Sequence, residues 1–160
     1  MPMKRTAQLD DDKDEPPRQQ QRTEAAFVLI GTEEVPLGAT ELNLSGKGLT
    51  ALPESIGKLQ ALTKLYVGGS KLTELPATFG SLIALTELYV DGNQLTELPA
   101  AIGSLAALTT LHVSSNQLTE LPATIGSLAA LTTLTVIGNP LQLPPLAVAQ
   151  RGPVAIKTFF

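Results

Sequence analysis

The 160-residue sequence contains no cysteine, no tryptophan and a single histidine, His112. The lack of cysteine excludes disulfide-bonded end caps, thiolate zinc sites and thiol nucleophiles. It also favours a reducing compartment, so we expect a cytoplasmic protein. No carboxylate cluster accompanies His112 at ligand spacing, so we expect neither a metal site nor any other cofactor.

Long apolar runs and an excess of basic residues are also missing. No run of 18 apolar residues occurs, and the opening MPMKRTAQLDDDKDE places acidic side chains where a secretory signal needs an apolar core. We therefore expect no membrane association. From residue 25 onward, six Lys or Arg stand against nine Asp or Glu without a basic stripe, so we expect no nucleic-acid partner.

What the sequence does contain is a repeat of 23 residues, for which the stretch LTELYVDGNQLTELPAAIGSLAA at 85–107 serves as the reference copy. Five copies follow one another without a gap, with equivalent positions at Ala39, Leu62, Leu85, Leu108 and Leu131. The recurring apolar positions of the reference copy are Leu85, Leu88, Val90, Leu95, Leu98, Ile102 and Leu105. A fixed period in this range indicates a solenoid.

Each copy alternates around its centre in a way that predicts a short, half-buried strand. In the reference copy, Leu88 and Val90 point to one side and Tyr89 to the other. Because all copies run the same way, their strands must pair in parallel. The predicted strand centres are Asn43, Tyr66, Tyr89, His112 and Thr135. The proline-led, alanine-rich second half of each copy predicts a short helical or 3₁₀ turn on the outer wall.

One polar column accompanies the leucines. Asn93, Asn116 and Asn139 occupy the place where the chain leaves the sheet, and an amide there can bond to unpaired backbone groups. The first two copies have Lys47 and Ser70 instead. We therefore expect an incomplete polar ladder, and a looser structure, at the N-terminal end.

These residues resemble the leucine-rich repeat family, whose pattern LxxLxLxxNxL is met in full at 85–95 and 108–118. The stretch LTELPATIGSLAA at 118–130 is similar to the 23-residue LPxxIGxL subtype of intracellular Ras-suppressor-like and Roco-like proteins. The resemblance covers about residues 38–143. It implies an α/β leucine-rich-repeat solenoid with five parallel strands on the concave face and short helical or 3₁₀ turns on the convex face.

The chain divides into four predicted segments. Residues 1–24 combine mixed charges with few aliphatic side chains and are predicted to be a disordered tail. Residues 25–38 begin with an apolar run and should form the N-terminal cap. Residues 39–143 hold the five repeats, of which the last is partial. Residues 144–160 should form a C-terminal helical cap. Its second helix should carry Val154, Ile156, Phe159 and Phe160.

The outward columns of the strands vary between copies and are therefore free to serve a partner. Tyr66, Tyr89 and His112 should stack on neighbouring strands, and aromatic side chains with polar tips are favoured at interface centres. The predicted partner-binding residues are Lys64, Tyr66, Glu87, Tyr89, Asp91 and His112. The alternative interpretation is ordinary cross-strand pairing on a hydrated sheet surface.

Known chemical motifs are not met. Ser114 lies near His112 without a fixed orienting carboxylate, and Gly57-Lys58 lacks phosphate-loop spacing, so we interpret Gly57 as a turn residue. We expect no enzyme but a monomeric, non-catalytic module that binds a protein or peptide on its concave face. The alternative is a fragment or accessory arm of a larger kinase-like or GTPase-like signalling protein, an idea prompted by the apolar ending VAIKTFF.

Overall fold

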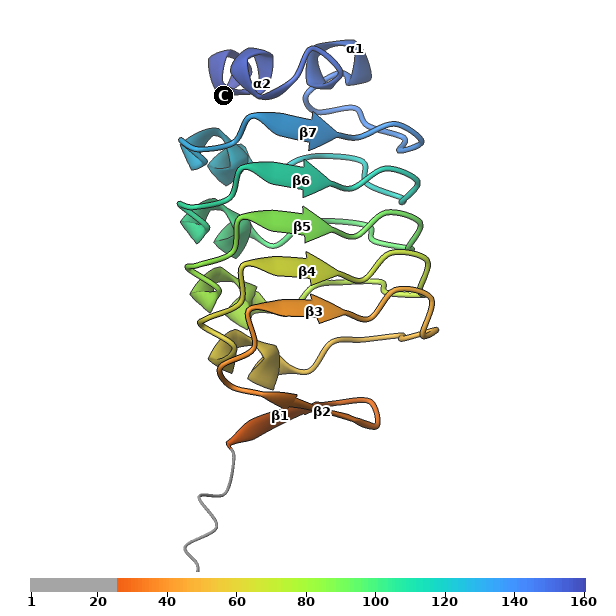
Figure 1. Ribbon diagram of the computed structural model, residues 1–160. Coiled ribbons are helices and arrows are strands. Elements are labelled where there is room, and N and C mark those ends of the chain that lie inside the picture. The colour runs from red at the N-terminus through yellow and green to blue at the C-terminus, as the bar shows by residue number, and fades with distance from the viewer. Residues whose placement is uncertain (1–25) are drawn as a thin grey trace, which may run out of the picture.

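The computed structural model describes residues 26–160, which form a stack of parallel strands closed by a hairpin at one end and two helices at the other (Figure 1). The five strands pair in chain order as β3 (Glu41–Asn43), β4 (Lys64–Tyr66), β5 (Glu87–Tyr89), β6 (Thr110–His112) and β7 (Thr133–Thr135). Pairing partners lie one repeat apart, as Leu65 with Leu88. The predicted α/β fold with five parallel strands is therefore confirmed. Each predicted centre is the last residue of its strand.

The outer wall consists of four 3₁₀ helices, as the sequence predicted. They are η1 (Glu54–Lys58), η2 (Ala77–Ser81), η3 (Ala100–Ser104) and η4 (Ala123–Ser127). A proline in extended conformation precedes each of them, for example Pro99 with φ −63° and ψ 143°. Its ring fixes φ and removes a backbone donor where the 3₁₀ helix begins.

The leucine columns fill the space between the sheet and the 3₁₀ helices. In the reference copy, all seven recurring apolar residues are buried, and the most exposed of them, Leu98, is only 4% exposed. Phe79 takes the place of Ile102 in the preceding copy and is fully buried as well. Since neighbouring copies supply most of the surface that covers each column, the repeats stabilise one another through stacking.

The asparagine column forms the predicted ladder. Asn116 donates to the carbonyls of Val90 and Val113, both at 3.0 Å, and accepts the N–H of Leu95 at 3.1 Å. Ser70 occupies the same position two copies earlier, and its buried hydroxyl has no hydrogen-bond partner among the described residues. The ladder is thus incomplete toward the N-terminal end. That this end is also the looser one stays a prediction.

Glycines recur where successive 3₁₀ helices touch. A Cβ atom added to Gly57 would lie 2.7 Å from the carbonyl oxygen of Thr78, and one added to Gly103 would lie 2.6 Å from that of Thr124. The prediction that Gly57 marks a turn is therefore wrong, because it lies inside η1 and serves close contact with η2. A side chain at Gly57 or Gly103 would push the outer wall apart.

The N-terminal end of the stack is covered by an antiparallel hairpin of β1 (Phe27–Ile30) and β2 (Glu33–Pro36). Val28, Ile30 and Val35 are buried in the common core. This hairpin lies within the predicted cap at 25–38, whereas the predicted disordered tail at 1–24 lies outside the described residues.

The C-terminal end is covered by α1 (Leu146–Ala149) and α2 (Pro153–Phe159). Of the four apolar residues expected along α2, only Ile156 is buried, while Val154 is 77% exposed and Phe159 and Phe160 are each 42% exposed. Both helices are short, and within residues 26–160 no helix has the length and apolar content needed to span a membrane.

Candidate functional site

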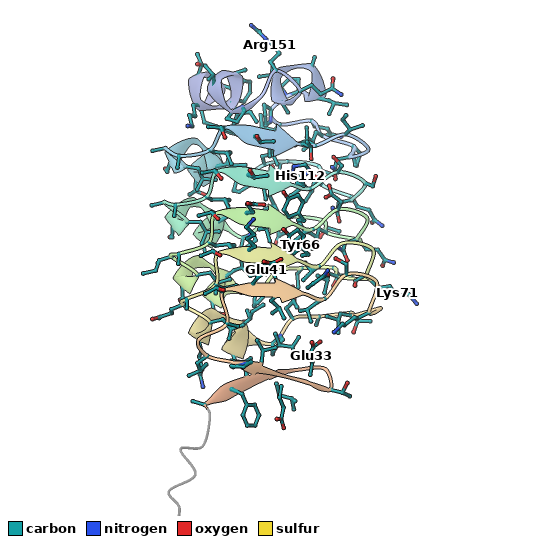
Figure 2. All side chains as sticks on the ribbon, viewed as in Figure 1. Glu33, Glu41, Tyr66, Lys71, His112 and Arg151 are labelled. Atoms are coloured by element: carbon teal, nitrogen blue, oxygen red, sulfur yellow. The ribbon has the colours of Figure 1, made fainter. Side chains whose placement is uncertain are left out.

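The six predicted site residues lie together along the outward face of the sheet. Lys64 and Tyr66 belong to β4, Glu87 and Tyr89 to β5, and His112 to β6. Figure 2 shows Tyr66 and His112 over the strands. No described element covers this surface, and its aromatic residues stay partly exposed (Figure 1). We call this surface the concave face. It consists of the outward side chains of β3 to β7 and of the second residue after each strand, such as Asp91 after β5.

The remaining predicted residue, Asp91, follows the end of β5. Its Oδ1 accepts the backbone N–H of Ser114 at 2.8 Å, which fixes the carboxylate beside the C-terminal ends of β5 and β6. Among residues 26–160, Asp91 forms no ion pair. Its charge is therefore not balanced by a neighbouring cation of the described chain.

Three rings stack across neighbouring strands, as predicted. The ring centroids of Tyr66 and Tyr89 are 4.8 Å apart with an interplanar angle of 13°. Those of Tyr89 and His112 are 4.7 Å apart and tilted by 34°. These distances match the usual strand spacing of about 4.8 Å, so the stack follows directly from placing one ring in each copy. The Tyr89 ring is consequently enclosed on both sides.

An ion pair lies next to this stack. The Lys64 ammonium is 3.0 Å from Oε1 of Glu87, and the Tyr89 hydroxyl donates to Oε2 of the same carboxylate at 3.0 Å. These hydrogen bonds, that of Lys64 above all, lower the pKa of Glu87. The hydrogen bond between Lys64 and Glu87, together with the charge of Glu87, raises the pKa of Lys64. Partial burial, followed by the bond to Glu87, raises the pKa of Tyr89.

One charged residue of this face was not among the predicted site residues. Glu41 lies in β3, directly opposite Lys64 in the register, and is exposed. Because Lys64 is engaged by Glu87, Glu41 has no ion-pair partner within the described part of the chain. The signal was present in the sequence, since Glu41, Lys64 and Glu87 occupy one repeat column.

Metal-binding and catalytic groupings of side chains are not found among the described residues. Within residues 26–160, no group of three or more His, Cys, Asp or Glu side chains could hold a metal ion. His112 packs against Tyr89. The side-chain hydrogen bonds described for residues 26–160 include none from His112 to a serine or a carboxylate, so they do not assemble a nucleophile–base–acid series.

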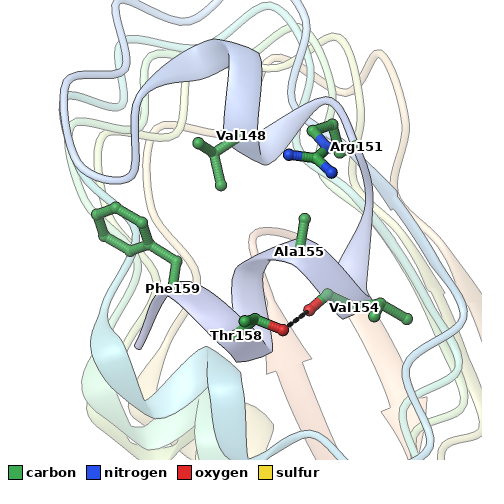
Figure 3. A pocket seen from close by; sticks show the side chains of 6 residues that line it. All are labelled: Val148, Arg151, Val154, Ala155, Thr158 and Phe159. Carbon is green, nitrogen blue, oxygen red and sulfur yellow. Dashed lines mark hydrogen bonds between the residues drawn. The ribbon is translucent and has the colours of Figure 1, made fainter.

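A groove of about 410 Å³ lies elsewhere, between α1 and α2 (Figure 3). Its walls are Val148, Arg151, Val154, Ala155, Thr158 and Phe159. The Thr158 hydroxyl donates to the carbonyl of Val154 at 2.9 Å, so its hydrogen is already used. Arg151 is the only ionisable side chain in the lining, and the groove therefore offers a mostly apolar surface without an acid–base pair.

Comparison with protein families gives a match to the model described as "Leucine rich repeat", over residues 38–95 and 83–141. Together these ranges include all five strands of the sheet. No curated protein sequence matches the chain.

Several solved structures resemble the chain. A leucine-rich-repeat protein of Leptospira interrogans is 36% identical with a TM-score of 0.61 over 64% of this chain. The leucine-rich repeat domain of APL1B is 27% identical with a TM-score of 0.61 over 64%. The functional domain of InlJ from Listeria monocytogenes, which includes a cysteine ladder, is 30% identical with a TM-score of 0.60 over 69%. The matches span only 30%, 33% and 24% of those three chains.

Proposed function

We propose that this chain, which belongs to the leucine-rich repeat family, binds a protein or peptide on its concave face and has no catalytic activity of its own. Domains of this family generally mediate protein–protein interactions and are typically non-catalytic. The observation that carries the proposal is the stack of Tyr66, Tyr89 and His112, which is left partly exposed on a sheet that no described element covers.

The concave face suits an extended partner. Five strands span four gaps of about 4.8 Å, and the outward positions of each copy extend over about five residues, which adds about 16 Å, so the wall offers on the order of 300 Å². A standard interface takes about 800 Å² from each partner. The proposed partner is therefore a peptide segment or a protein edge, bound weakly by this face alone.

The proposal includes the finer features expected from the sequence. The repeats are assigned to the LPxxIGxL subtype of intracellular, Ras-suppressor-like proteins, with LTELPATIGSLAA at 118–130 as support. A cytoplasmic, monomeric protein with a role in signalling is proposed in keeping with that subtype and with the absence of cysteine. Neither nucleic acid nor a membrane is a proposed partner, since the concave face carries three carboxylates against one ammonium group.

Affinity capture with two variants tests the binding surface. Tyr66→Ala combined with Tyr89→Ala removes most of the aromatic stack, whereas Glu74→Ala combined with Glu97→Ala alters two exposed residues of the turns. We expect the first variant to lose a partner that the wild type and the second variant retain. Circular dichroism should show that both variants are folded. A tyrosine variant that still captures the partner would move the binding site away from the concave face.

A second candidate is that the chain acts as an accessory arm of a larger signalling protein. The favouring observation is the apolar outer surface of the C-terminal helices, where Val154 is 77% and Phe159 42% exposed, because the ends of repeat arrays normally carry polar surfaces. Amide hydrogen exchange tests it. Residues 153–160 should exchange more slowly in the protein purified from its source than in the 160-residue chain, and equal rates would argue against the arm.

A further inference from the structure

The concave face carries negative charge that the described residues do not balance. Lys64 is the only Lys or Arg among its outward positions, and this ammonium is held by Glu87 at 3.0 Å. Glu41 and Asp91 remain without an ion-pair partner among residues 26–160. The three carboxylates all belong to the N-terminal half of the sheet, in β3 and β5 or just after β5. This half therefore attracts a cation, and the attraction is strongest at low ionic strength.

The aromatic stack is open at its N-terminal end. One face of the Tyr66 ring lies against Tyr89, and the strand on its other side presents Asn43. Asn43 is exposed, and its Oδ1 turns back to accept the N–H of Ser45 at 3.0 Å. No ring stacks on Tyr66 from this side within the described chain. The face of the Tyr66 ring toward β3 is therefore the one free of an aromatic neighbour, and it lies beside the strand that carries the unpaired Glu41.

An open aromatic face next to an unpaired carboxylate matches the chemistry of an arginine side chain. A guanidinium is planar, stacks on aromatic rings and forms two parallel hydrogen bonds to a carboxylate, whereas an ammonium does neither as well. Resting on the proposed function, we infer that the concave face recognises an extended segment through one arginine. Its guanidinium lies on the free face of Tyr66 and beside Glu41.

The rest of the segment crosses the uncharged half of the sheet. The outward residues of β6 and β7 include no Asp, Glu, Lys or Arg, and the exposed Ile137 follows β7. The distance from the gap between β3 and β4 to β7 is about 17 Å, at about 4.8 Å per strand. An extended chain covers this distance in about five residues. The recognised segment therefore has an arginine at one end and neutral or apolar residues after it.

The site contains its own spectroscopic reporters. Tyr66 and Tyr89 are the only two tyrosines, His112 is the only histidine, and the chain has no tryptophan. Tyrosine fluorescence and the imidazole NMR signals of the full chain therefore report on the concave face alone. The probe is the synthetic peptide acetyl-Arg-Ser-Thr-Ser-Val-amide, compared with analogues in which citrulline or lysine replaces its arginine. Citrulline keeps the planar shape and removes the charge.

We expect the arginine peptide to bind saturably, the citrulline peptide to bind about tenfold more weakly and the lysine peptide several-fold more weakly. Glu41→Gln should weaken the arginine peptide several-fold and leave the citrulline peptide unchanged, while the matched rim variant Glu97→Gln should change neither. Equal affinity of the arginine peptide and either analogue, no effect of Glu41→Gln, or no saturable binding at millimolar concentration would each overturn the inference.

These outcomes are separate from the test of the proposed function. If the tyrosine variant loses the captured partner but the citrulline and arginine peptides bind alike, the concave face remains the binding surface and only the arginine assignment fails. If the tyrosine variant retains the partner, the proposed function fails whatever the peptides do.

Discussion

Neighbouring residues of one strand have opposite roles in this protein. In β5, Leu88 is fully buried whereas Tyr89 is partly exposed on the concave face, and in β6 the same contrast holds for Leu111 and His112. The buried positions carry leucine in every copy, while the outward positions change from copy to copy. Residues that hold the repeats together are thus separated from residues available to a partner, and the two sets can be changed independently.

The largest effect should come from the buried side of a strand. Leu111→Ala removes a fully buried side chain from the stacked core and should lower the free energy of unfolding by about 2–5 kcal/mol. His112→Ala, one residue away, removes a partly exposed ring and should cost no more than about 1.5 kcal/mol, the upper value for an aromatic pair. Urea melts of both variants measure the difference. Similar losses would contradict the assignment of the two faces.

The second prediction concerns the polar part of the interior. Asn116→Ala leaves the N–H of Leu95 without its acceptor. It also removes one of two amide donors from each of the carbonyls of Val90 and Val113, which Asn93 and Asn139 still serve. A buried polar group without a partner costs about 1–3 kcal/mol, so we expect a loss of about 1–3 kcal/mol in the free energy of unfolding, measured by urea melts.

The chain offers the reverse experiment for this column. Ser70→Asn restores the amide where the ladder is interrupted, and the repeat register places the N–H of Leu49 and the carbonyls of Leu44 and Val67 in reach of it. This variant should be at least as stable as the wild type and should slow amide exchange in the first two copies. A clear loss of stability would show that the first copies are built differently, and not merely less completely.

The repeated columns explain how much of this structure could be predicted from the sequence. Five copies place leucine and proline at the same positions, and three of them share the asparagine, so the strands, the 3₁₀ helices and the buried face followed from comparison within one chain. The stack of Tyr66, Tyr89 and His112 followed as well, because the register of parallel strands brings equivalent positions together.

Features without a repeated counterpart were harder to predict. The hairpin at the N-terminal end occurs once, so the sequence indicated an apolar run but not its pairing with β2. Alternating charges at Glu41, Lys64 and Glu87 allowed Lys64 to pair with either carboxylate, and only side-chain geometry decides for Glu87. The glycine at position 57 was misinterpreted because a close contact between two copies leaves no separate signal in either one.

The third prediction tests that contact on the outer wall. A Cβ atom at Gly103 would lie 2.6 Å from both the Cβ and the carbonyl oxygen of Thr124, whereas one at Gly126 would lie 3.7 Å from the Cβ of Phe160. Gly103→Ala should therefore destabilise the fold by about 1–3 kcal/mol through overpacking. Gly126→Ala, at the equivalent position of η4, should stay within about 0.5 kcal/mol. Equal urea midpoints would refute the claim that spacing between copies requires this glycine.

The smallest effect should come from the charged pair on the concave face. The pKa of Glu87 is lowered in the folded protein, so its contribution to stability is present above the ordinary carboxyl pKa of 4.5 and is lost as the pH falls through the lowered value. The pKa values of Lys64 and Tyr89 are raised, so their contributions are present below the ordinary values of 10.5 and 10.0 and are lost as the pH rises through the raised ones.

Glu87→Gln isolates the acidic part of this dependence. Glutamine still accepts the hydrogen bond of Tyr89 but cannot attract Lys64 as an anion, so the variant should be slightly less stable than the wild type at neutral pH. The difference should shrink as the pH falls below about 4.5, because the wild-type carboxylate then becomes protonated too. Melting temperatures of both proteins across this pH range measure the difference in stability. High salt at neutral pH should also make this difference smaller, because it screens the ion pair. A difference that persists unchanged in acid would mean that packing at position 87, and not charge, is responsible.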